Sequence, residues 1–370
     1  MGERAGAKGE VGARRAPKDP TRPRGLKPAA QLVEEWFRVN ARALPWRPSP
    51  VDGARDPYAA LVSELMLQQT QVSRVLEKFG AFMERFPTVE SLAGAPEEDV
   101  LAAWSGLGYY RRARLLHAAA KAVMERHGGV FPRDAASLLA LPGVGRYTAG
   151  AIGSIVFGQR VPILDGNVER VLLRIHGNDA PPKDTATQGW AWGEAARLVE
   201  AAASPGVLNE GLMELGATVC TPGAPRCPAC PLKDVCVAFA QGRTAEIPRA
   251  KPRAKQTDWF VVCFVIEDKD RVLVETRGET GLWAGMVQAP GVEGEAPIGL
   301  ADAAAVVGVV AGEEIDRFVH VTTHRRVSFV VVRGVMTRAT LTGSRRWVER
   351  GALEGMAVSN AHRRVFGMDG

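Results

Sequence analysis

The sequence predicts a largely helical region followed by a smaller α+β domain. From about Pro28 to Ala240, apolar residues recur at helical spacing and Gly and Pro interrupt them at short intervals. A Pro-, Lys- and Arg-rich stretch from Gly242 to Thr257 reads as a linker, and β-branched runs typical of strands follow it. At 370 residues, 46% of them hydrophobic, the chain is long enough for two or three compact units.

The first 27 residues are expected to form a disordered basic arm, because they are rich in Arg, Lys and Gly and lack the apolar core of a secretory signal. No run of about 18 apolar residues occurs, so the sequence predicts no membrane span. The formal net charge of +6 suits a polyanionic partner without identifying one. We therefore expect a cytoplasmic protein.

Apolar periodicity predicts each helix in turn. Gln31–Leu44 and Tyr58–Phe86 are expected to be helical along their whole length. Shorter helices are expected at 96–104, 110–128, 134–141, 147–158, 166–177 and 189–203. In the C-terminal region, strands are expected at 259–268, 271–276 and 325–336, with a short helix at 301–310.

A glycine-rich turn joins two of these helices in the stretch Leu141–Ile152, LPGVGRYTAGAI. Gly143 and Gly145 can take positive φ and let a phosphate approach the backbone. The next helix would then point its N-terminal amides at that anion. A plain helical hairpin has the same pattern, so the turn alone leaves DNA binding open.

Four of the five cysteines form a cluster with the spacing C-x6-C-x2-C-x5-C, namely Cys220, Cys227, Cys230 and Cys236. Their grouping argues for one metal site in a reducing compartment and against a disulfide framework. Four thiolates this close can ligate one zinc ion or one iron–sulfur cubane, and the spacing alone does not decide between them. Cys263 lies in a β run and is expected to be buried.

The glycine hairpin, Asp165 twenty residues beyond Gly145, and the cysteine loop together resemble the helix-hairpin-helix superfamily of base-excision DNA glycosylases. That superfamily includes endonuclease III and the MutY-type adenine glycosylases. The resemblance to the MutY type runs from about Gln31 to the C-terminus. It is densest at Leu44–Arg47, Ser63–Val72, Gly106–Arg114, the hairpin and Ile163–Leu172.

This resemblance implies a domain plan. A mainly α helix-hairpin-helix core is expected at about 53–158, and an iron–sulfur subdomain from 28–52 and 159–240. The four cysteines are implied to hold a [4Fe–4S] cluster. After a linker at 241–257, residues 258–370 are implied to form an α+β Nudix-like domain that recognises 8-oxoguanine.

The resemblance also implies an activity: a monofunctional adenine DNA glycosylase of base excision repair. Such an enzyme flips adenine out of double-stranded DNA when it lies opposite 8-oxoguanine or guanine. We expect a monomer associated with the nucleoid. Endonuclease III-like enzymes carry a lysine where this chain has Tyr147, which has no amine for a Schiff base and so argues against a bifunctional lyase. A DNA-binding regulator without chemistry and a zinc-bearing scaffold remain as alternatives.

Adenine is a poor leaving group until a ring nitrogen is protonated, so the reaction needs a general acid that works near neutral pH. Glu64 lies in the apolar stretch LVSELML, where desolvation favours its neutral form. By itself it could equally be an ordinary helix glutamate. The resemblance makes Glu64 the catalytic acid and Asp165 the carboxylate that stabilises the oxocarbenium-like sugar. Asp165 stands at a predicted helix start, which should keep it charged, and Tyr147 and Asn167 are implied to orient it.

The remaining implied contacts fall into two groups. A base pocket maps onto Arg42, Leu44, Trp46, Arg47 and Glu210. Trp46 could stack on the flipped base or simply pack in the core. Gln69 and Tyr109 are implied to fill the space that the base vacates, while Thr70 and Leu107 flank the opposite base.

The stretch Gly281–Gly291, GLWAGMVQAPG, is the clearest match to the MutY-type C-terminal domain. The Glu-rich metal motif of a hydrolytic Nudix enzyme is missing from the sequence, so we expect this domain to bind without hydrolysing. The family places Phe-Ser-His on 8-oxoguanine. Here the matching residues are Thr322, Thr323 and His324, which keep a hydroxyl and an imidazole but lose the aromatic ring. His320 is an alternative out of register.

Overall fold

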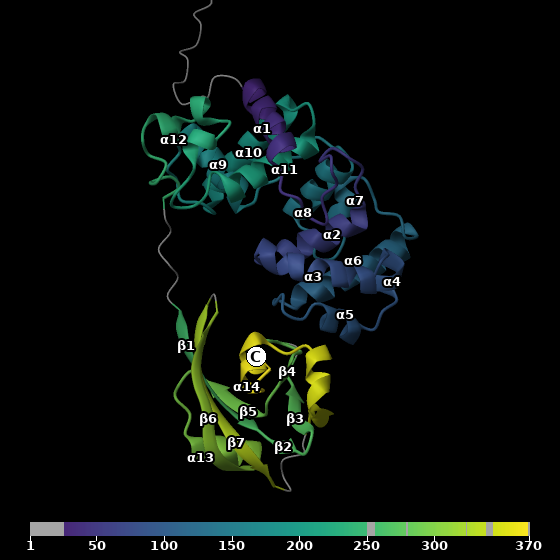
Figure 1. Ribbon diagram of the computed structural model, residues 1–370, viewed down its shortest axis with the longest axis vertical. Helices are drawn as coiled ribbons and strands as arrows, with labels where there is room; N and C mark the ends of the chain where they lie inside the picture. Colours follow the sequence, from purple (N-terminus) through teal and green to yellow (C-terminus); the bar gives the residue numbers. More distant parts are fainter. Residues whose placement is uncertain (1–25, 250–255, 279, 323, 338–342, 369–370) are drawn as a thin grey trace, which may run out of the picture.

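The computed structural model describes residues 26–249, 256–278, 280–322, 324–337 and 343–368. Most of the expected basic arm and Thr323 therefore lie outside the described residues. Figure 1 shows a helical part, whose helices run from Leu26 to Ala240, and a C-terminal part built on β-strands. In the described part of the chain, no helix is both long and apolar enough to cross a membrane.

The helical part contains α1 (Leu26–Asn40), α2 (Pro57–Leu67), α3 (Val72–Arg85), α4 (Val89–Ala93), α5 (Glu97–Ala103), α6 (Arg111–His127), α7 (Ala135–Leu139), α8 (Arg146–Ala151), α9 (Gly166–His176), α10 (Thr185–Ala201), α11 (Pro205–Thr218) and α12 (Val237–Ala240). A π-helical turn, η1 (Ile152–Val156), continues α8, and two 3-10 turns, η2 (Cys227–Ala229) and η3 (Lys233–Val235), lie in the cysteine loop.

The prediction of one helical run over Tyr58–Phe86 is wrong in its middle. Asp56 caps the start of α2 through the amides of Tyr58 and Ala59, and α2 ends at Leu67. The chain then turns through 68–71, where Gln69 adopts φ 56°, before α3 begins. The physical reason is tertiary, because the carbonyls at the end of α2 accept hydrogen bonds from Arg112 of α6.

Two apolar clusters form the core of the helical part. One gathers α2 to α8 around side chains such as Leu65, Phe82 and Trp104. The other gathers α1 and α9 to α11 around residues such as Leu172 and Leu208. Buried Asn209 of α11 links them, since its amide donates to the Ser154 hydroxyl of η1 (2.8 Å) and to the Val161 carbonyl (2.9 Å).

The C-terminal part contains two sheets. Its elements are β1 (Thr257–Val265), β2 (Glu267–Asp268), β3 (Arg271–Thr276), β4 (Val287–Gln288), β5 (Gly291–Gly294), α13 (Leu300–Val307), β6 (Val309–Val321), β7 (Arg325–Met336), β8 (Arg345–Glu349), η4 (Arg350–Gly355) and α14 (Asn360–Val365). The first sheet has the order β5-β1-β7-β6, with β1 and β7 parallel and the other pairs antiparallel. In the second sheet, β3 pairs with β2, β4 and β8.

Strands β3 and β7 have the bounds that the sequence predicts, and both ends of β1 lie within about three residues of the prediction. The helix expected at 301–310 ends earlier, at Val307, because Gly308 takes a left-handed conformation (φ 77°). Val309 and Val310 instead begin β6, a strand that the sequence did not reveal. Its alternation is broken by the irregular register around Glu314, which hides the period of two.

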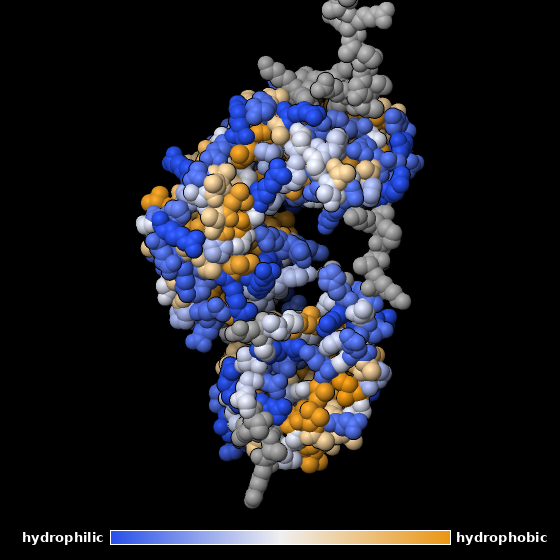
Figure 2. All heavy atoms as spheres, turned by 180° about the vertical axis from the view of Figure 1, so that it is seen from behind, coloured by the Kyte–Doolittle hydropathy of each residue, from blue (hydrophilic) through white to orange (hydrophobic). Residues whose placement is uncertain are grey.

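The two parts of the molecule share apolar surface. Met286 of the C-terminal part is buried within the α2 to α8 cluster. The Tyr110 hydroxyl, just before α6, donates to the Val358 carbonyl (3.5 Å). Figure 2 shows, from behind, that the molecule is hollowed between the helical part and the C-terminal part.

Candidate active site

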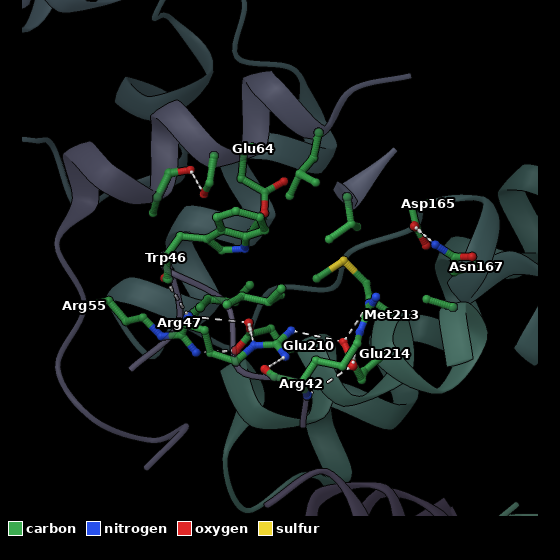
Figure 3. A pocket seen from close by; sticks show the side chains of 18 of the residues that line it. Arg42, Trp46, Arg47, Arg55, Glu64, Asp165, Asn167, Glu210, Met213 and Glu214 are labelled. Atoms are coloured by element: carbon green, nitrogen blue, oxygen red, sulfur yellow. Dashed lines mark hydrogen bonds and ion pairs between the residues drawn. The ribbon is translucent and has the colours of Figure 1, made fainter. Parts of the chain in front are cut away.

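A cavity of about 220 Å³ opens where elements of both helical clusters meet (Figure 3). Nine residues that the sequence predicts for catalysis or binding line it, namely Arg42, Leu44, Trp46, Arg47, Glu64, Thr70, Asp165, Asn167 and Glu210. Arg55, Met213 and Glu214 are among the further lining residues that were not predicted. The fold thus brings together side chains spread over most of the helical part.

Glu64 projects into this cavity from α2. Burial raises the pKa of its carboxyl to about 7, and the nearby carboxylates Glu210 and Asp165 push it in the same direction. A hydrogen bond with the Tyr147 hydroxyl opposes this rise. The direction is the one that the apolar sequence around Glu64 predicts, and it keeps a proton available near neutral pH.

Asp165 is the N-cap residue of α9. One carboxylate oxygen accepts the Val168 amide (2.7 Å), and the other accepts the Asn167 side-chain amide (2.8 Å). The position at the helix start is expected to keep this carboxyl charged, and the hydrogen bonds from Val168 and Asn167 do lower its pKa. Burial is the larger influence, however, and raises the pKa of Asp165 above its ordinary value.

Tyr147 lies beside both carboxyl groups, at the start of α8. Its hydroxyl contacts the Met213 sulfur (3.0 Å) and hydrogen-bonds with Glu64. Burial, followed by the charges of Glu64 and Asp165, raises the pKa of this phenol well above its usual value. The hydroxyl therefore stays protonated at neutral pH and can donate a hydrogen bond within the site.

Hydrogen bonds continue from Asp165 to the cysteine loop. The Asn167 side-chain oxygen accepts from Arg170 (2.8 Å), and Arg170 donates through Nε to the Cys220 carbonyl (2.7 Å). One turn later on α9, Arg174 donates to the Cys220 sulfur (3.3 Å). The same helix that presents Asp165 to the cavity therefore also holds the cysteine loop.

An ion-pair network forms one wall of the cavity (Figure 3). Arg42 pairs with Glu214 through two nitrogens, at 2.6 and 3.1 Å. Arg47 bridges Glu210 (3.0 Å) and Glu214 (3.2 Å), and Arg55 also pairs with Glu210. Glu210 and Glu214 are one helical turn apart on α11, a spacing that could have revealed both acids as one face.

Trp46 satisfies both interpretations offered for it. Its ring packs edge-to-face on Phe79 with centroids 5.3 Å apart, and it also lines the cavity. The ring is therefore fixed by the core while one surface remains available to a ligand.

The residues implied to act on the opposite strand are placed differently from one another. Gln69 is exposed, and Tyr109 is 53% exposed; both have positive φ, at 56° and 47°. Leu107 is only 5% exposed and belongs to the helical core. Its side chain therefore packs in the core of the helical part and not on its surface.

Of the two hairpin glycines, only Gly143 has the positive φ that the sequence predicts. Gly143 has φ 75°, and an added Cβ there would lie 2.7 Å from the Leu115 Cβ. Gly145 instead has an ordinary φ of −90°, as the N-cap residue of α8, and its missing side chain faces open space. Gly143 is thus required by the turn itself, whereas Gly145 leaves the outer face of the hairpin bare.

The four clustered cysteines lie in one loop after α11. Each of Cys220, Cys227 and Cys236 is close enough to Cys230 to affect the pKa of its thiol. Backbone amides of Leu232 and Phe239 donate toward Cys230 and Cys236. Among the described residues, no group of three or more His, Cys, Asp or Glu side chains is arranged to hold a single metal ion.

Of the implied lesion-reading residues, Thr322 and His324 lie between β6 and β7. The Thr322 hydroxyl is used by the turn, since it accepts the Arg325 amide (3.0 Å) and donates to the Arg325 carbonyl (3.1 Å). His324 is exposed, while Thr323 is outside the described residues. His320 is partly buried and packs against Trp283 with ring centroids 5.8 Å apart.

Taken together, the helical hairpin, the paired carboxyl groups and the enclosed pocket define a base-excision DNA glycosylase. Residues 62–195 match the family model of the HhH-GPD superfamily base excision DNA repair proteins, and residues 261–368 match that of the NUDIX domain.

Within this class, the chain is similar to glycosylases that are named for adenine. The adenine DNA glycosylase of Homo sapiens is 34% identical over 90% of this chain and 72% of its own length. That of Arabidopsis thaliana is 37% identical over 79% of this chain and 54% of its own length. A solved thermostable thymine-DNA glycosylase is 26% identical, covers 58% of this chain and 97% of its own, and superposes with a TM-score of 0.51. The chain belongs to the adenine DNA glycosylase family and hydrolyses an N-glycosyl bond in base excision repair.

The two hairpin glycines give a matched test. Gly143→Ala should lower the free energy of unfolding by about 1–3 kcal/mol, because alanine is strained at positive φ and meets Leu115. Gly145→Ala should leave stability within about 0.5 kcal/mol but weaken duplex binding, because the methyl occupies the bare outer face. Urea unfolding and a duplex binding titration measure both. Unchanged binding by Gly145→Ala would remove the hairpin face from the DNA contact.

Glu64 should make stability depend on pH. Its pKa is about 7 in the folded chain against 4.5 for the free group, so folding favours the protonated form. That contribution is complete below about pH 4.5 and disappears as pH rises through about 7. The stability of Glu64→Gln relative to the native protein should therefore increase by about 1–3 kcal/mol between pH 4.5 and 8. Urea unfolding across this range measures it, with exposed Glu84→Gln as the control. A flat difference would show that Glu64 is not buried as described.

Proposed function

We propose that the protein is a monofunctional adenine glycosylase that removes adenine lying opposite 8-oxoguanine or guanine in duplex DNA. It works as a monomer, in the cytoplasm and on the nucleoid. The observation that carries this proposal is the meeting of two partly buried carboxyl groups with raised pKa values, Glu64 and Asp165, in one cavity beside the Tyr147 hydroxyl. Each comes from a different helical cluster, so the cavity can hold the base on one side and its sugar on the other.

The two carboxyl groups have different tasks in this reaction. Glu64, with a pKa of about 7, is half protonated at neutral pH and donates its proton to a ring nitrogen of adenine. The departing base leaves positive charge on the sugar, which the Asp165 carboxylate stabilises until water adds. Asn167 holds one oxygen of Asp165 at 2.8 Å, and Tyr147 keeps its hydroxyl toward Glu64. These two residues orient the pair.

The proposed enzyme cleaves only the glycosidic bond and does not cut the DNA strand. A lyase forms a Schiff base between an amine and the sugar. The residues that line the described cavity include no lysine, and position 147 of the hairpin holds a tyrosine. This supports a glycosylase that leaves the DNA strand intact.

The flipped adenine needs a pocket that binds it, and the space that it leaves in the duplex must be filled by side chains. Trp46 offers a ring surface to the base, and the network of Arg47 and Glu210 offers polar atoms to its edge. Gln69 and Tyr109 are exposed beyond the cavity and fill the vacated stack. The hollow between the two parts of the molecule gives the duplex room to be contacted from both sides (Figure 2).

The cysteine loop fits a [4Fe–4S] cluster in its donor set. Cys220, Cys227, Cys230 and Cys236 supply four thiolates, and backbone amides and the Arg174 guanidinium donate toward their sulfurs. Such hydrogen bonds are the usual surroundings of cluster sulfurs. When bound, the cluster would fix the fold of the loop. Zinc is the alternative that the cysteine spacing alone leaves open.

Recognition of the base opposite adenine is assigned to the C-terminal part, with His324 as its exposed side chain and Thr323, the preceding residue in the sequence, as its partner. Thr322 is bonded within its own turn and contributes little. Because the aromatic residue of the family is absent, hydrogen bonding must carry most of this recognition.

The reaction can be tested with duplexes carrying adenine opposite 8-oxoguanine, guanine or thymine. The native protein should release adenine from the first two without cutting the strand until hot alkali is added. Glu64→Gln should lower the single-turnover rate at least about 10²-fold while duplex binding persists, because glutamine cannot supply the proton. A near-native rate in that variant would remove Glu64 from the chemistry. Efficient borohydride trapping would contradict the monofunctional proposal.

The cysteine loop can be tested separately. Cys227→Ser should lower both the iron content and the soluble yield, because metal binding in such a loop is part of its folding. Cys263→Ser, in the C-terminal sheet, should leave the iron content unchanged. Absorbance near 410 nm and iron analysis measure the cluster. If the purified native protein contained zinc and no iron, the proposed [4Fe–4S] cluster would be wrong and a zinc site would take its place.

A further inference from the structure

Gln69 and Tyr109 stand on backbone conformations that side-chain-bearing residues rarely adopt. Gln69 has φ 56° just after α2, and Tyr109 has φ 47° just before α6, next to Gly108 at φ 70°. Such conformations persist at functional sites only when the surrounding structure holds them in place. The two loops are far apart in sequence, so a shared support must come from tertiary contacts.

That shared support is Arg112, in the first turn of α6. Its guanidinium is buried, with the whole residue 7% exposed. It donates to six acceptors at the end of α2 and in the two loops, namely the carbonyls of Leu65 (2.7 Å), Met66 (2.9 Å), Gln68, Leu107 (3.1 Å) and Gly108 (3.2 Å) and the hydroxyl of Thr70 (2.9 Å). Gln68 and Thr70 flank Gln69 in one loop, and Gly108 precedes Tyr109 in the other.

The environment of Arg112 is unusual for a buried cation. Within the described part of the chain, its hydrogen-bond acceptors are carbonyls and a hydroxyl, with no carboxylate among them. The carbonyls at the C-terminal end of α2 carry the partial negative charge that compensates it. The rings of Trp104 and Tyr109 lie 5.5 and 5.4 Å from its central carbon. Burial lowers the pKa of Arg112 to about 10, so it remains charged at neutral pH.

The geometry demands an arginine. A planar guanidinium presents five N–H donors in a fixed fork, which can reach two loops at once. A lysine ammonium has three donors at a single point and cannot bridge the same acceptors. The Arg112 guanidinium therefore links the end of α2 to the loop before α6. Trp104 strengthens this link by donating to the Gly108 carbonyl (3.1 Å).

We infer that Arg112 is a positioning residue that holds Gln69 and Tyr109 ready to enter the duplex as adenine leaves it. The inference rests on the proposed function, in which these two side chains fill the vacated stack. Arg112 also binds carbonyls beside Glu64 on α2, so a test must separate support of the two fillers from support of the acid.

A double-mutant cycle separates them. Single-turnover adenine release from an adenine:8-oxoguanine duplex is measured for Arg112→Lys in the native chain and in a Gln69→Ala/Tyr109→Ala background. In the native chain the rate should fall about tenfold or more, and in the background without fillers by less than about twofold, because coupled residues are not additive. Exposed Arg111→Lys, the adjacent residue, is the control and should keep the native rate.

Each other outcome has a definite meaning. An equal loss in both backgrounds, or a shifted pH dependence of the rate, would show that Arg112 supports Glu64 and would overturn the inference. A native rate for Gln69→Ala/Tyr109→Ala would instead overturn the filler role itself and leave the Glu64 chemistry untouched. If Arg112→Lys does not fold, Trp104→Phe keeps the ring, removes the N–H that holds Gly108, and enters the same cycle with an expected loss of about threefold. Equal losses by Trp104→Phe in the two backgrounds would again overturn the inference.

Discussion

The close approach of α11 to its neighbours is the constraint on which the site depends. Gly216 lies so near α9 that an added Cβ would be 2.6 Å from the Cβ of Asn167, and one on Gly206 would be 2.7 Å from the Ser154 carbonyl. No side chain fits at either contact without moving backbone. Because α11 rests directly on both elements, it brings Glu210, Met213 and Glu214 to the same cavity as the start of α9.

The arginine-rich wall does not force Glu64 to ionise, because each of its three arginines is paired with Glu210 or Glu214. Arg55 lowers the pKa of Glu64, but burial is the largest influence and raises that pKa. A wall with these arginines unpaired would lower that pKa and take away the proton that the reaction needs. Pairing within the wall therefore allows a polar pocket to contain a neutral carboxyl group.

Helix α9 couples the catalytic carboxylate to the cysteine loop. Its first turn holds Asp165 and Asn167, and the next two turns send Arg170 and Arg174 to Cys220 and its neighbours. A change in the fold of that loop would reach Asp165 through only two side chains. This gives the loop a place in the site even though no cysteine lines the cavity.

The sequence by itself determined the helical and α+β class of fold, the glycine hairpin and the cysteine spacing, because these follow from local periodicity and residue type. The nine predicted residues that line the cavity, from Arg42 to Glu210, followed from the resemblance to MutY-type glycosylases and not from local pattern. The raised pKa of Glu64 was also predictable, because the apolar residues around it are its neighbours along the same helix.

The tertiary structure alone decided the rest. The break between α2 and α3, the left-handed Gln69 and Tyr109 and the pairing of Glu214 with Arg42 all depend on partners far away in the chain. The raised pKa of Asp165 has the same origin, since the helix start visible in the sequence favours ionisation while burial by distant helices opposes it. Local pattern shows which groups are present, but desolvation and hydrogen bonding depend on what packs around them, and packing is set by the whole fold.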